Sequence, residues 1–337
     1  MKKKPAAFVS ALCALFCAFL LSCADERPAK ETVMVSIPPL RTLVAGLLDS
    51  AVDVRTLVPS GASPEQFEPS PEDIRALSRA KLLFAIGENF ESAWLGRVQR
   101  QLTSLRVENL GEGLATLRFE DEDEDDEHEH HHDDGEHEEH EGLEHHHDDG
   151  EHEEHEEHAH EHDGHHHHHA GADPHIWTDP ANLAELSRRA ATVLAQVYPE
   201  RADSVSARLN RRLAELERLD SVLAETLAPA RGKAILVFHP AWGYLCNRYG
   251  LRQIAIEHAG HSPSPRALAG IIDRAKRERA AAIFVAAQTD KRVAASIAEQ
   301  LGIPVVEIDP IAPDFRSSLT ATAKAFAGSA APEDLSE

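Results

Sequence analysis

Residues 202–227 have the sequence ADSVSARLNRRLAELERLDSVLAETL. Apolar residues recur along this run every three or four positions, with charged residues between them: Val205, Leu209, Leu213, Leu216, Leu219 and Leu223. This spacing predicts one amphipathic helix of 26 residues, which would be about 39 Å long. Two roles fit such a helix: a rigid strut between two domains, or an ordinary amphipathic helix in a single core.

On both sides of this run, short apolar segments rich in β-formers alternate with helical patterns. The expected strands are 32–37, 52–58, 81–86 and 105–110 before it, and 234–238, 253–257, 281–286 and 304–308 after it. Strands that alternate with helices predict βαβ units and a parallel sheet. Both halves repeat this order, and a length of 337 residues suits two domains. The predicted fold class is therefore α/β, with two βα domains and parallel sheets.

A low-complexity tract interrupts the first half between Glu120 and His169. It holds 19 of the 23 histidines and 25 of the 58 acidic residues, and it contains no lysine or arginine. The net charge of −24 therefore belongs to this tract, while the rest of the chain is nearly neutral. Such a composition cannot bury enough apolar surface to offset its chain entropy, so we expect the tract to be disordered.

Imidazoles interleaved with carboxylates are ligands for divalent metals such as zinc, so the tract predicts metal contact. A solvated acidic spacer is the alternative. An expression tag would explain the five histidines at 165–169, but it would not explain 19 histidines at mid-chain. The same acidic charge would repel phosphate, so we expect no nucleic-acid partner.

The first residues have the pattern of an export signal. Lys2, Lys3 and Lys4 precede an apolar run that ends at Leu21 and is shorter than the ~20 residues of a spanning helix. The following Ser22-Cys23 resembles the end of a bacterial lipobox, which implies cleavage before Cys23 and a lipid on its thiol. A short membrane anchor is the alternative. Cleavage would leave Cys246 as the one other thiol, and we expect it to be a buried residue without a disulfide.

Four side chains from separated segments have the chemistry of metal ligands. Glu65, His239 and Asp309 follow predicted strands, where parallel sheets place their ligands. His175 lies in a loop just before a predicted helix. Two imidazoles and two carboxylates suit a four-coordinate metal. A histidine at a strand end is more often a hydrogen-bonding residue than a ligand, so the spacing alone leaves both interpretations open.

Several segments together resemble the ZnuA/TroA-like group, the zinc- and manganese-binding solute-binding lipoproteins of bacterial ABC importers. They are GASPEQFEP (61–69), DPHIW (173–177), FHPAWGY (238–244), YGL (249–251), SPSP (262–265) and VVEIDP (305–310). The resemblance spans residues 32–327 in the order of the family. A histidine- and acid-rich insertion before the Asp-Pro-His motif is typical of the zinc-binding members.

The resemblance implies two βα domains joined by a long rigid helix, with a metal site in the cleft between them. We therefore expect a signal peptide (1–22), a lipidated tether (23–31), an N-terminal βα domain (32–119), a disordered loop (120–169), the end of the N-terminal domain (170–199), a linker helix (200–229) and a C-terminal βα domain (230–330).

The resemblance also implies a ligand set. His175, His239 and Asp309 match metal-ligand places of the family. The first ligand there is usually the histidine of a Pro-His pair, but this chain has Pro64-Glu65. Three outcomes are open: Glu65 supplies a carboxylate oxygen, His258 or His261 takes the place, or water completes the site. We favour Glu65.

The predicted metal is zinc, with manganese possible. Two nitrogens and two carboxylates form a harder donor set than three histidines would, which suits manganese or iron better. Zinc nevertheless binds most such sites more tightly than manganese, and the histidine tract also indicates zinc.

The predicted function is extracytoplasmic zinc capture on the periplasmic side of the membrane, by a lipid-anchored monomer that is not an enzyme and delivers the ion to an ABC permease. The tract would raise the local concentration of metal through many weak sites. Two other classes stay open: a zinc buffer, and a metallohydrolase with Glu65 as its base. No His-Glu-x-x-His sequence supports the hydrolase.

Overall fold

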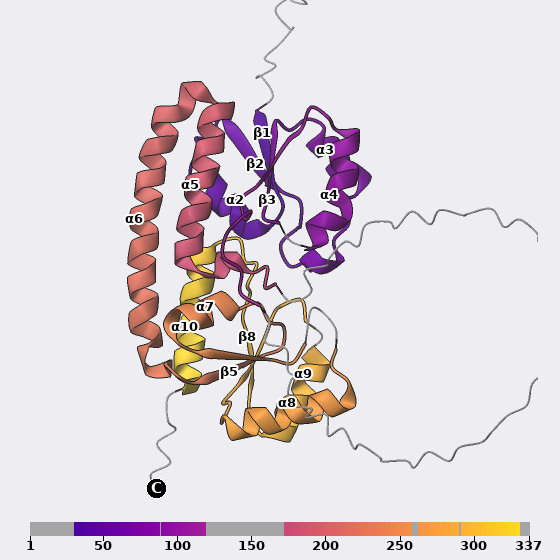
Figure 1. Cartoon of the computed structure of the whole chain (residues 1–337), viewed down its shortest axis with the longest axis vertical. Helices are drawn as coiled ribbons and strands as arrows, with labels where there is room; N and C mark the ends of the chain where they lie inside the picture. The colour runs from indigo at the N-terminus through magenta and orange to yellow at the C-terminus, as the bar shows by residue number, and fades with distance from the viewer. Residues whose placement is uncertain (1–29, 88, 119–171, 258–261, 290, 331–337) are drawn as a thin grey trace, which may run out of the picture.

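The computed structural model describes residues 30–87, 89–118, 172–257, 262–289 and 291–330. The predictions for the signal segment, Cys23, the tract 120–169, His258 and His261 lie outside the described residues. Within these ranges the chain forms two lobes, one above the other in Figure 1. Two long helices, α5 (Pro180–Val197) and α6 (Ala202–Leu227), run along one side.

The N-terminal lobe is built around a parallel sheet with strand order β2-β1-β3-β4. Its elements are β1 (Glu31–Val35), α2 (Pro38–Ala45), β2 (Val52–Thr56), α3 (Pro71–Leu77), β3 (Leu82–Ala85), α4 (Asn89–Gln101) and β4 (Arg106–Asn109). In the central strand β1, Val33 pairs with Val54 on one side and with Leu82 on the other. Because β2 and β3 lie on opposite sides of β1, a crevice is expected at the carboxyl ends of these strands.

The C-terminal lobe repeats this arrangement with strand order β6-β5-β7-β8, again all parallel. Its elements are β5 (Ala234–Val237), α7 (Gly243–Tyr249), β6 (Arg252–Ala255), α8 (Pro265–Arg277), β7 (Ile283–Val285), α9 (Lys291–Leu301), β8 (Val305–Glu307) and α10 (Phe315–Ala330). Gly250 ends α7 at a φ of 74°, a left-handed conformation that glycine adopts without steric cost. The chain can therefore reverse at once into β6, which places residues after β5 and β6 side by side.

Helix α6 connects the two lobes. It packs along α5 toward one end and along α10 toward the other (Figure 1). Leu216 and Leu223 are buried in α6, while Val222 is 47 % exposed. The buried Arg212 contacts both lobes, because its Nη2 donates to the Thr42 carbonyl of α2 at 3.2 Å and its guanidinium lies 5.5 Å from the Phe315 ring of α10. The fold class predicted from the sequence, two parallel α/β domains with a long joining helix, is confirmed.

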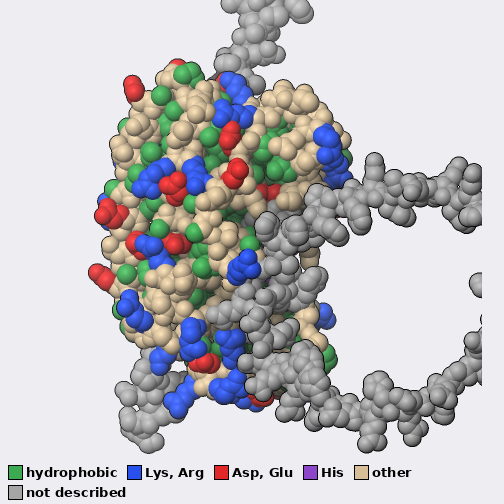
Figure 2. All heavy atoms as spheres, viewed as in Figure 1, with side chains coloured by type: hydrophobic (Ala, Val, Ile, Leu, Met, Phe, Trp, Pro, Cys, Tyr) green, Lys and Arg blue, Asp and Glu red, His purple; other side chains and the backbone are tan. Residues whose placement is uncertain are grey.

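The hydrophobic core continues from one lobe into the other. One cluster of buried side chains runs from the N-terminal sheet through α5 and α6 to α7 and α10, and a second cluster lies between the C-terminal sheet and helices α8 and α9. Cys246 is buried and free, as predicted; it belongs to the first cluster, and burial raises the pKa of its thiol to about 12. On the face seen in Figure 2, charged side chains of both signs are interspersed over α5 and α6. Among the described residues, no helix has the length and apolarity needed to cross a membrane.

Candidate metal centre

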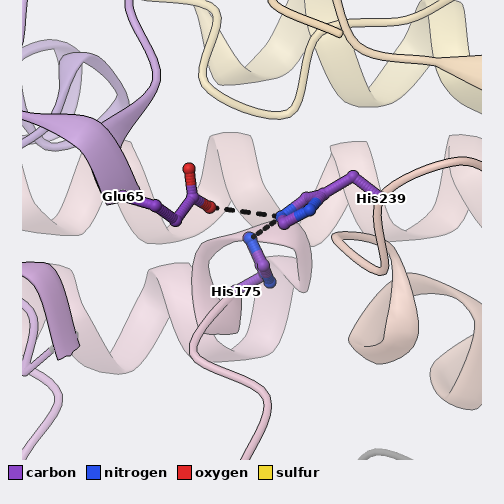
Figure 3. Close-up of side chains that lie close together, drawn as sticks. All are labelled: Glu65, His175 and His239. Carbon is purple, nitrogen blue, oxygen red and sulfur yellow. Dashed lines mark hydrogen bonds and ion pairs between the residues drawn. The ribbon is translucent and has the colours of Figure 1, made fainter. Parts of the chain in front are cut away.

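Three polar side chains meet at the junction between the lobes (Figure 3). Glu65 lies in a short 3₁₀ turn (Pro64–Gln66) after β2, His175 precedes a second 3₁₀ turn (Ile176–Thr178), and His239 follows β5. Each offers one ligand atom, and the three atoms lie within 4.8 Å of one another. The structure therefore brings together three of the four residues predicted from the sequence.

The spacing of these atoms suits a small metal ion. The Nε2 atom of His239 is 3.3 Å from His175 Nε2 and 3.3 Å from Glu65 Oε1. Zinc–nitrogen bonds of about 2.0–2.1 Å place two ligands of tetrahedral zinc roughly 3.3–3.4 Å apart. Both pairs thus have the separation of neighbouring ligands on one tetrahedral ion, and both histidines direct the same nitrogen toward the centre (Figure 3).

Asp173 contacts the His175 ring at Nδ1, the nitrogen that does not face the centre. This nitrogen lies 2.8 Å from Asp173 Oδ1, and the same oxygen accepts the backbone N–H of His175 at 2.9 Å. Tyr244 of α7 donates its hydroxyl to the Asp173 carbonyl, which ties this loop to the C-terminal lobe. Gly243 is needed beside it, because a Cβ atom there would lie 2.4 Å from Asp173 Oδ2. The loop therefore fixes His175 before any metal arrives.

His239 lies between two carboxylates. Burial alone would lower the pKa of His239, but Glu257, at 3.4 Å from Nδ1, and Glu65, at 3.3 Å from Nε2, outweigh burial and raise this pKa to about 9. Burial alone would raise the pKa of Glu65, but His239 and a hydrogen bond of 2.5 Å from the Ser63 hydroxyl lower it to about 2. The pair is therefore an imidazolium and a carboxylate near neutral pH, and a metal ion must displace a proton from Nε2.

Asp309 is placed differently from the other three. Its carboxylate is not in the group of mutually close ligand atoms, and its Oδ1 accepts the backbone N–H of Ile311 at 3.0 Å. The next residues, Pro310 and Ile311, do line the cavity at the centre. The turn after β8 therefore reaches the site, while the Asp309 carboxylate is bonded within its own loop.

A cavity of about 330 Å³ surrounds the centre. Its walls come from both lobes: Ser63, Pro64, Glu65, Gln66, His175 and Trp177 from one, and His239, Glu257, Ala286, Gln288, Thr289, Pro310 and Ile311 from the other. Trp177 is buried, and its indole N–H donates to the Pro310 carbonyl at 2.7 Å. Its ring also lies 5.2 Å from that of His175, so it packs between the lobes beside the ligand group.

Sequence reasoning did not assign roles to two residues of the centre. Asp173 was visible in the Asp-Pro-His motif, two positions before His175, where a short loop can return a carboxylate to the ring. Glu257 lies just beyond the carboxyl end of β6, the neighbour of β5, and hence beside His239. The signal for Glu257 was an acidic residue at a predicted strand end, the same signal that selected Glu65.

Two parallel α/β lobes, a long joining helix and a ligand group between the lobes define the fold of a two-lobed solute-binding protein. The model of one family, described as the periplasmic zinc-uptake complex component A, ZnuA, matches residues 33–327. The chain belongs to this family, which confirms the resemblance inferred from the sequence motifs.

Individual relatives agree with this assignment. The chain is 26% identical over 315 residues to the zinc-binding protein AdcA of Streptococcus pyogenes serotype M3, a match that covers 92% of this chain and 56% of the relative. It is 23% identical to the zinc-binding lipoprotein AdcA of Streptococcus pneumoniae serotype 4, covering 92% of this chain and 55% of the relative. The chain thus spans about half the length of these relatives.

Among solved structures, a zinc-bound ZnuA deletion mutant superposes with a TM-score of 0.72 and 28% identity. The match covers 90% of this chain and 99% of that one.

Proposed function

We propose that this protein captures zinc outside the cytoplasm and delivers it to the permease of an ABC importer. The observation that carries the proposal is the meeting of Glu65, His175 and His239 at the junction of two lobes, where the three ligand atoms lie within 4.8 Å of one another and His239 Nε2 is 3.3 Å from each of the other two. The family is described as a component of a zinc-uptake complex, and relatives named as zinc-binding proteins support zinc as the cargo. In this function the protein acts by binding and release, without catalysis.

Two imidazoles and one carboxylate favour zinc over manganese. Borderline nitrogen ligands suit zinc, and zinc stands above manganese in affinity for most sites with nitrogen and oxygen donors. The carboxylate of Glu65 is the one hard donor among these three ligands, so manganese or iron is the alternative cargo of the same fold.

Capture uses both lobes. Glu65 and His175 lie in loops of the N-terminal lobe, and His239 belongs to the C-terminal lobe. An ion bound to all three bridges the lobes and replaces the ion pair between Glu65 and His239. The loaded and empty proteins thus differ in the contacts that join the lobes, and we propose that the permease distinguishes them through this difference.

The fourth ligand is Asp309, water or a histidine that follows β6. If Asp309 is the ligand, its carboxylate must release the Ile311 N–H and turn toward the cavity, which is a change within one loop. Water requires no such change and fits the cavity. His258 and His261, which follow β6 in the sequence and lie outside the described residues, are the histidine candidates from the sequence.

The acidic histidine tract and the predicted lipid on Cys23 complete the proposal. The tract holds metal loosely and raises its concentration near the tight centre. The lipid keeps the protein on the periplasmic side of the membrane, and the pneumococcal relative is named a lipoprotein. The protein works as a monomer beside its permease.

A competitive titration of zinc and manganese against a chelator tests the proposal. The chain is used without its signal segment, both with and without residues 120–169. One tight zinc site should be present in both forms, should be lost in His175→Ala and His239→Ala, and should be weakened in Glu65→Ala. Manganese bound as tightly as zinc would assign a different cargo. No tight site would reject the proposal.

A second candidate, a zinc hydrolase, is favoured by one observation. Three protein ligands beside a cavity of about 330 Å³ leave room for a metal-bound water, the arrangement of catalytic zinc sites. Assay of the zinc-loaded protein with ester and peptide substrates distinguishes the two functions. Turnover that is lost in Glu65→Gln would support the hydrolase.

A further inference from the structure

We infer that Glu257 is a positioning residue of the metal centre, which holds the Nδ1–H of His239 so that Nε2 faces the ion. This inference rests on the proposed function and adds to it the residue that sets the ring orientation on the C-terminal lobe. Glu257 itself does not belong to the group of mutually close ligand atoms.

The backbone fixes Glu257 next to His239. Strand pairing between β5 and β6 continues past the strand ends, because Ile256 N donates to Val237 O at 2.9 Å and Glu257 N donates to Phe238 O at 2.8 Å. Glu257 is therefore hydrogen-bonded to the residue that precedes His239. Its side chain is 21 % exposed and that of His239 is 19 % exposed, so the pair is shielded from most of the solvent.

The two ends of the His239 ring meet different partners. Glu257 Oε2 lies 3.4 Å from Nδ1. His175 Nε2 and Glu65 Oε1 each lie 3.3 Å from Nε2, on the side that points into the centre. A proton kept on Nδ1 by Glu257 leaves the Nε2 lone pair for the metal, which is the tautomer that the ligand group requires.

The other histidine has the same arrangement. His175 has Asp173 at 2.8 Å from Nδ1 and directs Nε2 toward His239. Each lobe thus supplies one histidine together with a carboxylate at its Nδ1: Asp173 in the N-terminal lobe and Glu257 in the C-terminal lobe. Metal-binding histidines generally have such a partner, and its removal typically costs about 10- to 100-fold in metal affinity.

The test compares three substitutions of Glu257 in the full chain by competitive zinc titration, with a chelator strong enough to strip isolated imidazoles. Glu257→Ala should weaken zinc binding by about 10- to 100-fold. Glu257→Gln keeps an oxygen that can accept from Nδ1–H but has no charge, so it should lose less zinc affinity than Glu257→Ala. Glu257→Asp keeps the charge and should also bind zinc more tightly than Glu257→Ala. Glu307→Gln, an exposed acid of the same sheet that pairs with Lys291, should bind zinc like the unmodified protein.

Nitrogen-15 NMR of the zinc-loaded protein gives a readout that a merely structural role would not change. His239 should show a protonated Nδ1 protected from solvent exchange in the unmodified protein and in Glu257→Gln, and this protection should be lost in Glu257→Ala. Unchanged zinc affinity and unchanged Nδ1 protection in Glu257→Ala, while His239→Ala loses the tight site, would overturn the inference alone. Retention of the tight site in His239→Ala would overturn the proposed centre together with it.

Discussion

Glu65 is the acidic member of the ligand group and faces His239 across the junction between the lobes. Ser63 donates to its second oxygen, so the loop that carries Glu65 also orients it. A carboxylate oxygen is a harder ligand than an imidazole nitrogen and accepts manganese or iron more readily than a third histidine would. The residue at position 65 should therefore influence which ion the centre retains.

Replacement of Glu65 by histidine tests this influence. We expect Glu65→His to weaken manganese binding more than zinc binding, because three nitrogens form a softer donor set. Parallel competitive titrations with both metals measure the change in preference. Ser63→Ala, which removes the orienting hydroxyl and keeps the carboxylate, is the matched control and should shift both affinities in the same direction. An unaltered preference in Glu65→His would mean that residue 65 provides no ligand.

Zinc binding should release a proton from His239. The pKa of His239 is raised to about 9, so its Nε2 is protonated at neutral pH and must lose that proton to bind metal. Apparent zinc affinity should therefore increase with pH through the neutral range up to about 9 and then level off. Zinc titrations in a series of buffers give the slope. In Glu257→Gln the affinity should level off at a lower pH, because one of the two acids that raise the pKa of His239 becomes neutral. A flat profile in the unmodified protein would contradict the ion pair.

The same pair should make the stability of the zinc-free protein depend on pH. The folded-state pKa of His239 is raised from 6.5, so its contribution is complete below 6.5 and is lost as pH rises through about 9. The folded-state pKa of Glu65 is lowered from 4.5, so its contribution is present above 4.5 and is lost as pH falls toward about 2.

Urea unfolding of the zinc-free protein at a series of pH values measures this dependence. As pH rises, the loss of unfolding free energy due to His239 has an upper limit of roughly 3 kcal/mol. His239→Gln should remove most of it. An equally steep alkaline decline in this mutant would assign the decline to other groups.

At the scale of elements, helix α6 couples the lobes through a narrow buried stripe. Leu223 is fully buried near the end of α6, and its sequence neighbour Val222 is 47 % exposed. Leu223→Ala should reduce the free energy of unfolding by about 2–5 kcal/mol, because it leaves a cavity in the core. Val222→Ala should change it by less than about 0.5 kcal/mol, because that side chain contacts mainly solvent. Chemical denaturation of both mutants checks the difference, and equal effects would mean that the stripe does not hold α6.

The regular elements were predictable from the sequence to different degrees. The helix expected at 202–227 is α6 with the same ends, because its apolar period is a property of that run alone. The strand expected at 253–257 is β6 at Arg252–Ala255, and its backbone pairing continues to Glu257, whose side chain contacts His239. This contact depends on the pairing of β6 with β5, which joins separate parts of the chain. The position of Asp309 also escaped prediction, because its carboxylate bonds to the backbone of its own turn.

At the scale of the whole molecule, the centre exists only where two lobes meet. Glu65 and His239 come from different sheets, and α6 and the shared core hold those sheets in one arrangement. The sequence motifs identified these side chains as ligand types, but their separation of 3.3 Å follows from the packing of the lobes. A site built in this way is sensitive to any change in lobe orientation. It should be insensitive to the removal of a loop whose two ends lie side by side in the fold.

The acidic histidine tract should be such a loop. Its flanks are joined in the fold, because Arg118 and Ala172 form an antiparallel bridge and Asp173 N donates to Leu117 O at 2.8 Å. Deletion of residues 120–169 with a short glycine linker should therefore leave the fold intact, and a shorter loop costs less closure entropy. The tight zinc site should persist, since Glu65, His175 and His239 all lie outside the deletion.

Two measurements check this expectation. Thermal unfolding should be unchanged or slightly raised in the deletion, and a direct zinc titration should lose the weak equivalents supplied by the 19 histidines while keeping one tight equivalent. Replacement of the same residues by a glycine–serine segment of equal length separates loop length from metal binding, because it removes the histidines and retains the loop. Loss of the tight site in both variants would mean that the tract contributes a ligand to the centre. Its loss in the short variant alone would mean that the linker distorts the loop that carries His175.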